Sequence, residues 1–176
     1  MQTIKIWAIT GSTRKNSGNF KILKYISNQF QSEFEFEIFG ALDALPHFNP
    51  DLDTDNPPKE ITSFRNKIIN ADGIIICTPE YVFSLPGSLK NALEWCVLTT
   101  IFSNKKTGLI TASASGEMGH EQLLLIMKTL EAKFDDNTQL LIKGVRGKVG
   151  AEGEITNQET AEALQNFTKK FENQFL

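Results

Sequence analysis

Short apolar runs recur along the chain at the spacing of alternating strands and helices. Four of them are almost wholly apolar, which is typical of strands buried on both faces: residues 4–9, 73–77, 108–112 and 140–142. Residues 34–38 alternate phenylalanine or isoleucine with glutamate, which predicts a half-buried strand near an edge of the sheet. Each run is followed within two residues by Gly, Pro, Ser or Thr, so each strand is expected to end in a loop.

Amphipathic stripes at helical spacing fill the gaps between these runs. Five apolar residues between Leu89 and Val97 fall at i, i+3, i+4, i+7 and i+8, which predicts a helix over residues 88–98. Asn157 is suitably placed to cap the last helix of the chain. The other four helices are expected around residues 23–30, 61–68, 123–134 and 164–175.

Five strands alternating with five helices predict an α/β fold with a parallel sheet and helices on both of its faces. The 176 residues are enough for one such domain, so we expect a single domain over residues 1–176. In open parallel sheets, ligands bind beyond the carboxyl ends of the strands. The loops after the first, third and fourth strands are therefore where a functional site is expected.

Charge and residue counts exclude several classes of protein. The chain carries 18 Lys and Arg against 21 Asp and Glu, a net charge of −3, so no nucleic-acid partner is expected. Its two cysteines, Cys77 and Cys96, and two histidines, His47 and His120, lack the spacing of a metal site or a disulfide scaffold. No leading hydrophobic segment and no run of about 18 apolar residues is present, so we expect a cytoplasmic protein without a membrane partner.

The loop over residues 11–19, GSTRKNSGN, follows a buried strand and opens a helix. Hydroxyl groups, one guanidinium and the free amides of a helix start together suit a phosphate dianion. The loop lacks the GK[ST] ending of a Walker A motif and the G-x-G-x-x-G pattern of a dinucleotide fold. The alternative is a polar turn in which Ser17 or Asn19 caps the helix.

The two later loops can complete a ligand site. Residues 78–87, TPEYVFSLPG, form a proline-bracketed loop with aromatic residues, which can support a planar ligand or pack on a partner subunit. Residues 111–120, TASASGEMGH, are mostly small, which lets a ligand approach the backbone closely. The alternative for this third loop is a flexible linker.

Together these loops resemble the signatures of the NAD(P)H-dependent FMN reductases, which include quinone, chromate and azo-dye reductases. Residues 11–19 are similar to the family pattern GS-x-R-x-x-S-x-N, and residues 78–95, TPEYVFSLPGSLKNALEW, to TPEYN-x-S-x-PG-x-LKNA-x-[DE]W. The resemblance covers roughly residues 3–175. It implies a flavodoxin-like sandwich with strand order 2-1-3-4-5, FMN as cofactor and NADPH or NADH as electron donor.

The resemblance also implies roles for twelve residues. It implies that the FMN phosphate is held by Ser12, Arg14, Ser17 and Asn19. It implies that the isoalloxazine ring is lined, largely through backbone contacts, by Pro79, Glu80, Tyr81 and Val82. It places four residues along the other side of the flavin: Ser113, Ser115, Gly116 and Gly119.

Two positions depart from the family pattern. Val82 stands where the family usually has Asn, so a polar contact near the flavin is expected to be missing. After Gly119 the family usually has a basic residue, and here His120 follows instead of Arg. For His120, contact with cofactor or donor and a purely structural role are equally compatible with the sequence.

The implied function is an oxidoreductase in which FMN takes hydride from NAD(P)H and passes electrons to a quinone, flavin or similar small acceptor by a ping-pong mechanism. No catalytic side chain is required, which agrees with the lack of a Ser/His/Asp or Cys/His constellation. A homodimer or homotetramer is expected. The alternatives are a non-catalytic electron carrier and a flavin-binding regulatory protein.

Three smaller interpretations concern residues outside these loops. Cys77 and Cys96 are expected to be buried small hydrophobic residues. His47 is expected to take part in structural packing. The acidic stretch from Asp51 to Asp55 is expected to be a solvated loop.

Overall fold

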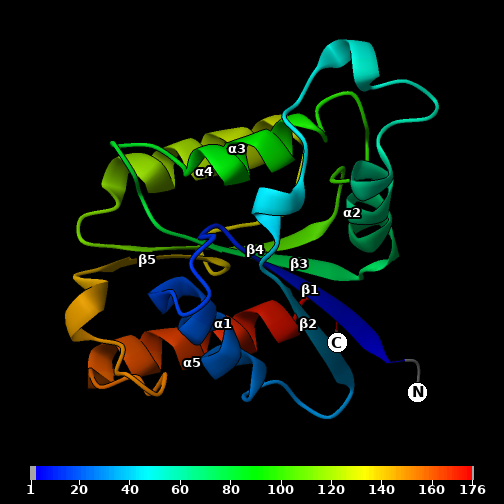
Figure 1. Ribbon diagram of the computed structural model, residues 1–176. Coiled ribbons are helices and arrows are strands. Elements are labelled where there is room, and N and C mark those ends of the chain that lie inside the picture. The colour runs from blue at the N-terminus through cyan, green and yellow to red at the C-terminus, as the bar shows by residue number, and fades with distance from the viewer. Residues whose placement is uncertain (1–2, 176) are drawn as a thin grey trace.

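A twisted parallel sheet forms the centre of the molecule (Figure 1). The computed structural model describes residues 3–175. Within them the sheet has five strands in the order β2-β1-β3-β4-β5, and every neighbouring pair is parallel, as the sequence predicts. The strands are β1 Ile4–Thr10, β2 Phe34–Phe39, β3 Gly73–Thr78, β4 Lys106–Ser113 and β5 Gln139–Lys143.

Helices cover both faces of this sheet (Figure 1). On one face lie α1 Gly18–Ser27 and α5 Gln158–Glu172, and on the other α2 Lys59–Asn70, α3 Gly87–Glu94 and α4 Glu117–Thr129. The described residues also form three short 3₁₀ helices: η1 Leu42–Ala44, η2 Pro50–Leu52 and η3 Val145–Gly147. The flavodoxin-like sandwich is thereby confirmed.

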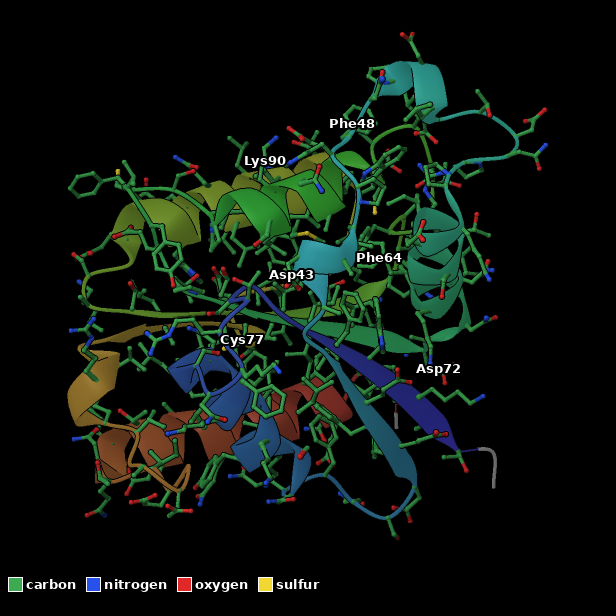
Figure 2. All side chains as sticks on the ribbon, viewed as in Figure 1. Asp43, Phe48, Phe64, Asp72, Cys77 and Lys90 are labelled. Carbon is green, nitrogen blue, oxygen red and sulfur yellow. The ribbon has the colours of Figure 1, made fainter. Side chains whose placement is uncertain are left out.

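Alternation along the buried strands divides the core into two layers. Ile74 and Ile76 of β3 pack toward α2, α3 and α4, whereas Ile75 and Cys77 pack toward α1 and α5. Figure 2 shows Phe64 of α2 and Cys77 of β3 on opposite sides of the sheet. Because both faces are covered, the strands are the continuous apolar runs seen in the sequence.

Both cysteines are free and buried, as predicted. Burial raises the pKa of Cys77, and it raises the pKa of Cys96 to about 12. Neither thiol is therefore ionised near neutral pH, and neither is a candidate nucleophile.

The helix predicted over residues 88–98 is shorter than its apolar stripe. α3 ends at Glu94, and Val97 and Leu98 beyond it are exposed. The reason lies at Trp95, whose carbonyl accepts a hydrogen bond from Arg65 Nε at 2.8 Å. The amide of Thr99, which would bond to that carbonyl in a continuing helix, instead donates to Cys96 at 3.1 Å.

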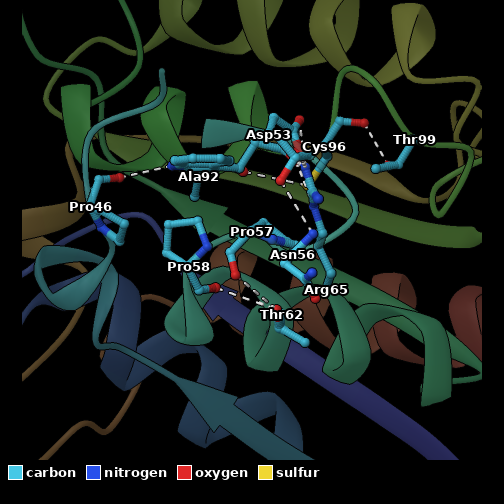
Figure 3. Close-up of polar contacts among 12 residues, drawn as sticks. Pro46, Asp53, Asn56, Pro57, Pro58, Thr62, Arg65, Ala92, Cys96 and Thr99 are labelled. Atoms are coloured by element: carbon cyan, nitrogen blue, oxygen red, sulfur yellow. Dashed lines mark hydrogen bonds and ion pairs between the residues drawn. The ribbon is translucent and has the colours of Figure 1, made fainter. Parts of the chain in front are cut away.

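The interpretation of residues 51–55 as solvated is wrong for one residue. Asp51 and Asp55 are exposed, but the side chain of Asp53 is only 4% exposed and pairs with Arg65 (Figure 3). Arg65 Nη2 lies 2.7 and 2.8 Å from the two carboxylate oxygens of Asp53. The pair fastens the loop before α2 to the helix itself.

The packing role expected for His47 is also wrong, because His47 is exposed. Its neighbours make the contacts instead. The carbonyl of Pro46 accepts from Asn91 Nδ2 at 3.0 Å and from Trp95 Nε1 at 2.8 Å, and Phe48 packs edge-on against Trp95. The segment is therefore held by α3 through residues on either side of the histidine.

Across residues 3–175, none of the helices combines the length and apolar character needed to cross a membrane. The same residues contain no group of three or more His, Cys, Asp or Glu that could hold a metal ion.

Candidate functional site

The loops after β1, β3 and β4 meet in one cleft at the carboxyl ends of these strands. The cleft has a volume of about 550 Å³, within the range of small-molecule sites. It brings together eight of the twelve residues expected from the sequence: Ser12, Arg14, Ser17, Asn19, Pro79, Glu80, Tyr81 and Ser113. The other four, Val82, Ser115, Gly116 and Gly119, do not line it.

The first loop presents the start of α1 to the cleft. Ser17 is the N-cap, and its Oγ accepts from the amide of Phe20 at 3.1 Å. Ser12 Oγ accepts from the amide of Arg14 at 3.3 Å, which shapes the loop and leaves the guanidinium exposed. Because the first amides of a helix have no intrahelical partner, this end of the cleft attracts an anion. Ser17 therefore both caps the helix and lines the cleft.

Asn19 lies beneath the loop rather than on its surface. The residue is buried, and its Nδ2 donates to the carbonyl of Ala112 at 3.3 Å. Its Oδ1 accepts from Cys77 Sγ at 3.3 Å. The amide thus links α1 to the ends of β3 and β4 and fixes the floor of the cleft.

Glu80 joins the second loop to the third through its side chain. Its carboxylate accepts from the amide of Gly116 at 3.1 Å and from the amide of Gly119 at 2.8 Å. A Cβ at Gly119 would lie 3.0 Å from Glu80 Cβ, so a larger residue there would push the loops apart. The negative charge also faces the N-terminus of α4, which is favourable. Glu80 therefore organises the site with its carboxylate, whereas the sequence emphasised its backbone.

Residues 81–84 form a tight turn that projects away from the protein. Tyr81 and Ser84 exchange two backbone hydrogen bonds of 2.9 and 3.0 Å, and Val82 and Phe83 both have positive φ, 52° and 56°. Val82 is 95% exposed. Such turns favour Asn and Gly, because a β-branched residue is strained in this conformation. The Asn usual at this position suits the backbone itself, not only a ligand contact.

Replacing Val82 by Asn is therefore expected to raise the free energy of unfolding of the single chain by about 1 kcal/mol, since it relieves left-handed strain at a side chain that is exposed within the chain. Urea denaturation at two protein concentrations measures this and separates it from any change in self-association. Val97→Asn is the control, because Val97 is 51% exposed and has no positive φ. An equal gain in both variants would contradict the strain argument.

The third loop is held mainly by contacts within the protein. Ser115 Oγ donates to Glu117 at 2.7 Å, and Glu117 also pairs with Lys143, which lowers the pKa of Glu117 to about 2. His120 does not line the cleft: its Nδ1 lies 2.9 Å from Thr111 Oγ1. Burial lowers the pKa of His120, so the ring is neutral near pH 7. Of the two roles left open for His120, the structure favours the structural one.

Sequence reasoning missed the side of the cleft that follows β5. Val145, Arg146 and Val149 line it there, Asn16, Ala112 and Ala114 line it from the first and third loops, and Lys21 lines it from α1. The only signal in the sequence was the glycine spacing at residues 144, 147 and 150, which indicates a loop but not its position.

Comparisons with known proteins identify the family of this chain. The family model for NADPH-dependent FMN reductases matches residues 4–147. A 2-hydroxy-1,4-benzoquinone reductase from Burkholderia sp. is 31% identical over 96% of this chain and 94% of its own length. An NADH:(hydroxy)cinnamate reductase subunit from Vibrio ruber is 30% identical over 93% of this chain and 83% of its own length.

Solved structures show the same fold. The flavoenzyme NAD(P)H:(acceptor) oxidoreductase FerB from Paracoccus denitrificans matches with a TM-score of 0.84 and 25% identity, over 97% of this chain and 96% of that one. The family match, the relatives and the fold converge on one assignment. The chain belongs to the NADPH-dependent FMN reductase family, flavodoxin-like enzymes that use FMN with NAD(P)H as electron donor.

Proposed function

We propose that FMN binds in the cleft between the three loops, with its phosphate at the start of α1 and its ring against the second loop. One observation carries this proposal: an anion-binding helix start and the Pro79–Tyr81 segment line the same cleft. Ser12, Arg14 and Ser17 supply hydroxyl and guanidinium donors at the phosphate end. Pro79 and Tyr81 supply a stiff surface for a planar ring.

FMN bound in the cleft would supply the redox chemistry, as the hydride acceptor for NAD(P)H and the electron donor for a small acceptor. The protein binds and orients the reactants. The amides of Gly116 and Gly119 are occupied by Glu80, so they fix the third loop. Of the twelve expected residues, we therefore assign direct contact to the eight in the cleft and a supporting role to Val82, Ser115, Gly116 and Gly119.

The acceptor we propose is a small quinone or a flavin. The relative from Burkholderia sp. is a 2-hydroxy-1,4-benzoquinone reductase, and it matches nearly the whole chain. The cleft is open, so a planar acceptor can replace the donor over the flavin, as a ping-pong mechanism requires. The cytoplasmic location stays a prediction from the sequence.

Anaerobic mixing tests this function. The purified protein is loaded with FMN and mixed with NADPH or NADH, and the visible absorbance of the flavin is followed. We expect bleaching by at least one donor and recovery of the absorbance when a benzoquinone is added. Binding of FMN without bleaching by either donor would indicate a flavin-binding protein without turnover. A flavin that bleaches but is not reoxidised by the quinone would contradict the acceptor.

We also propose that a second copy of the chain packs on the turn at residues 81–84 and the outer face of α4. Gln122 of α4 contacts the turn, accepting from Ser84 Oγ at 2.6 Å and donating to the carbonyl of Phe83 at 3.3 Å. Met118 and Leu125 lie on the same helix face as Gln122 and are 42% and 65% exposed. With Val82 and Phe83 they form an apolar surface beside the cleft, which favours a homo-oligomer whose partner closes it.

Phe83→Asp is expected to shift the protein toward monomers, because a charge would be buried at the centre of this surface. Sedimentation equilibrium measures the shift. Ile69→Asp is the control, since Ile69 is 52% exposed on α2, outside the apolar surface. A wild-type protein that is monomeric at all concentrations and still binds FMN fully would contradict the shared cleft.

A further inference from the structure

Arg146 reaches the cleft from the segment after β5, which the family signatures do not include. Gly144, the residue between β5 and η3, has a φ of 64°, and its amide donates to the carbonyl of Ala114 at 3.0 Å. This turn directs η3 across the carboxyl end of the sheet toward α1. Residue 146 thereby comes to line the same cleft as Arg14, although 132 positions separate them in the sequence.

The contacts of η3 place Arg146 at the phosphate end of the cleft. A Cβ at Gly18, the first residue of α1, would lie 3.5 Å from Val145 Cγ2. Lys21 of α1 donates to the carbonyls of Gly150 and Ala151 at 3.1 and 2.7 Å. The segment that carries Arg146 therefore lies against the first turns of α1, where the anion is expected.

The positive charges that line the cleft indicate a role for Arg146. Three cationic residues line the cleft, Arg14, Lys21 and Arg146, and Lys21 is engaged by the two carbonyls. Among the described residues, the guanidinium groups of Arg14 and Arg146 have no hydrogen-bond or ion-pair partner of their own. A phosphate monoester carries about −1.5 to −2 charges near neutral pH, so one arginine alone does not neutralise it.

We propose that Arg146 is the second guanidinium that holds the phosphate of FMN, opposite Arg14. This inference rests on the proposed FMN site. A planar guanidinium can donate two parallel hydrogen bonds to phosphate oxygens, a geometry that lysine lacks. The phosphate is then held between the first loop and η3, and FMN is distinguished from riboflavin by two arginines instead of one.

Binding of FMN and of riboflavin to the full chain, measured by flavin fluorescence, tests the proposal. Arg146→Ala is expected to weaken FMN binding about 10- to 100-fold, as for one charged hydrogen-bonding group, and to leave riboflavin binding unchanged, because riboflavin has no phosphate. Arg14→Ala is expected to behave in the same way. Arg146→Lys should recover part of the loss. The matched control is Lys148→Ala, which removes a nearby charge outside the cleft and should leave both affinities unchanged.

The outcomes separate this inference from the proposed function. If wild-type protein binds FMN and Arg146→Ala binds it equally well, Arg146 does not hold the phosphate. Equal weakening of FMN and riboflavin would also overturn the proposal, because it would show an effect on the loop or the ring. If Arg14→Ala weakens the binding of FMN but not of riboflavin, and Arg146→Ala does not, the FMN site is supported and the inference on Arg146 fails. If wild-type protein binds neither flavin, the FMN site itself fails.

Discussion

Replacing Glu80 by alanine is expected to lower the free energy of unfolding by about 3 kcal/mol and to weaken FMN binding strongly. The carboxylate accepts from the amides of Gly116 and Gly119 at 3.1 and 2.8 Å. Each hydrogen bond to a charged group contributes about 1.5–3 kcal/mol, and both amides would lose their acceptor. The second and third loops would then no longer be held together, so the cleft between them would lose its fixed shape. Urea denaturation and FMN titration measure the two effects.

The control for this experiment is Glu117→Ala. Glu117 is also at the start of α4 and also accepts hydrogen bonds, but its pair with Lys143 is exposed, with side chains 44% and 55% accessible. Exposed pairs contribute about 0–1 kcal/mol, so little change is expected. Glu80→Gln keeps one acceptor oxygen, so its loss of unfolding free energy should lie between those of Glu80→Ala and Glu117→Ala. Similar small losses in all three variants would show that Glu80 does not hold the loops together.

The strands could be predicted because the sheet is buried on both faces, whereas their order was implied by the family resemblance and is confirmed by the structure. Residues 74–77 are apolar without interruption, since Ile74 and Ile76 face one layer and Ile75 and Cys77 the other. The half-buried β2 at the edge alternates instead, as its glutamates indicate. The position of the cleft follows from the fold itself, because the loops at the carboxyl ends of parallel strands meet.

The chemistry within the cleft was harder to predict, because it depends on contacts between distant segments. The bonds of Glu80 join residues 36 and 39 positions apart, and a motif that contains Glu80 does not show which way its carboxylate turns. Arg146 belongs to no motif, and it reaches the site through the turn at Gly144 and the contacts of its segment with α1. The effect of Val82 was also not predictable, because Val82 lowers stability through a strained backbone conformation that the residue type alone does not reveal.

The end of α3 shows how a tertiary contact can override a helical pattern. The apolar stripe continues to Val97, so periodicity alone extends the helix. Arg65 of α2 instead occupies the carbonyl of Trp95 and pairs with Asp53. The loop that carries Asp53 is polar and rich in proline, which is why the sequence indicates a solvated segment.

Arg65→Ala is expected to lower the free energy of unfolding by about 3–5 kcal/mol, the cost of leaving a buried charge without its partner. The Asp53 side chain is 4% exposed and the Arg65 side chain 12%, so without the guanidinium the Asp53 carboxylate would be left largely shielded from solvent. Asp53→Ala should cost a similar amount. Replacing both residues by apolar side chains of similar size should recover much of the loss. Thermal or urea denaturation measures each value.

Lys67→Ala, on the same helix, is the matched control, because its pair with Glu37 is about half exposed and should contribute about 1 kcal/mol or less. None of Arg65, Asp53 and Trp95 lines the cleft, so the FMN affinity of folded Arg65→Ala protein should equal that of the wild type. If Arg65→Ala lowers the free energy of unfolding as little as Lys67→Ala does, the pair of Arg65 and Asp53 does not behave as a buried ion pair. A loss of FMN affinity without a loss of stability would mean that α2 and its loop contribute to the site, which the described contacts do not predict.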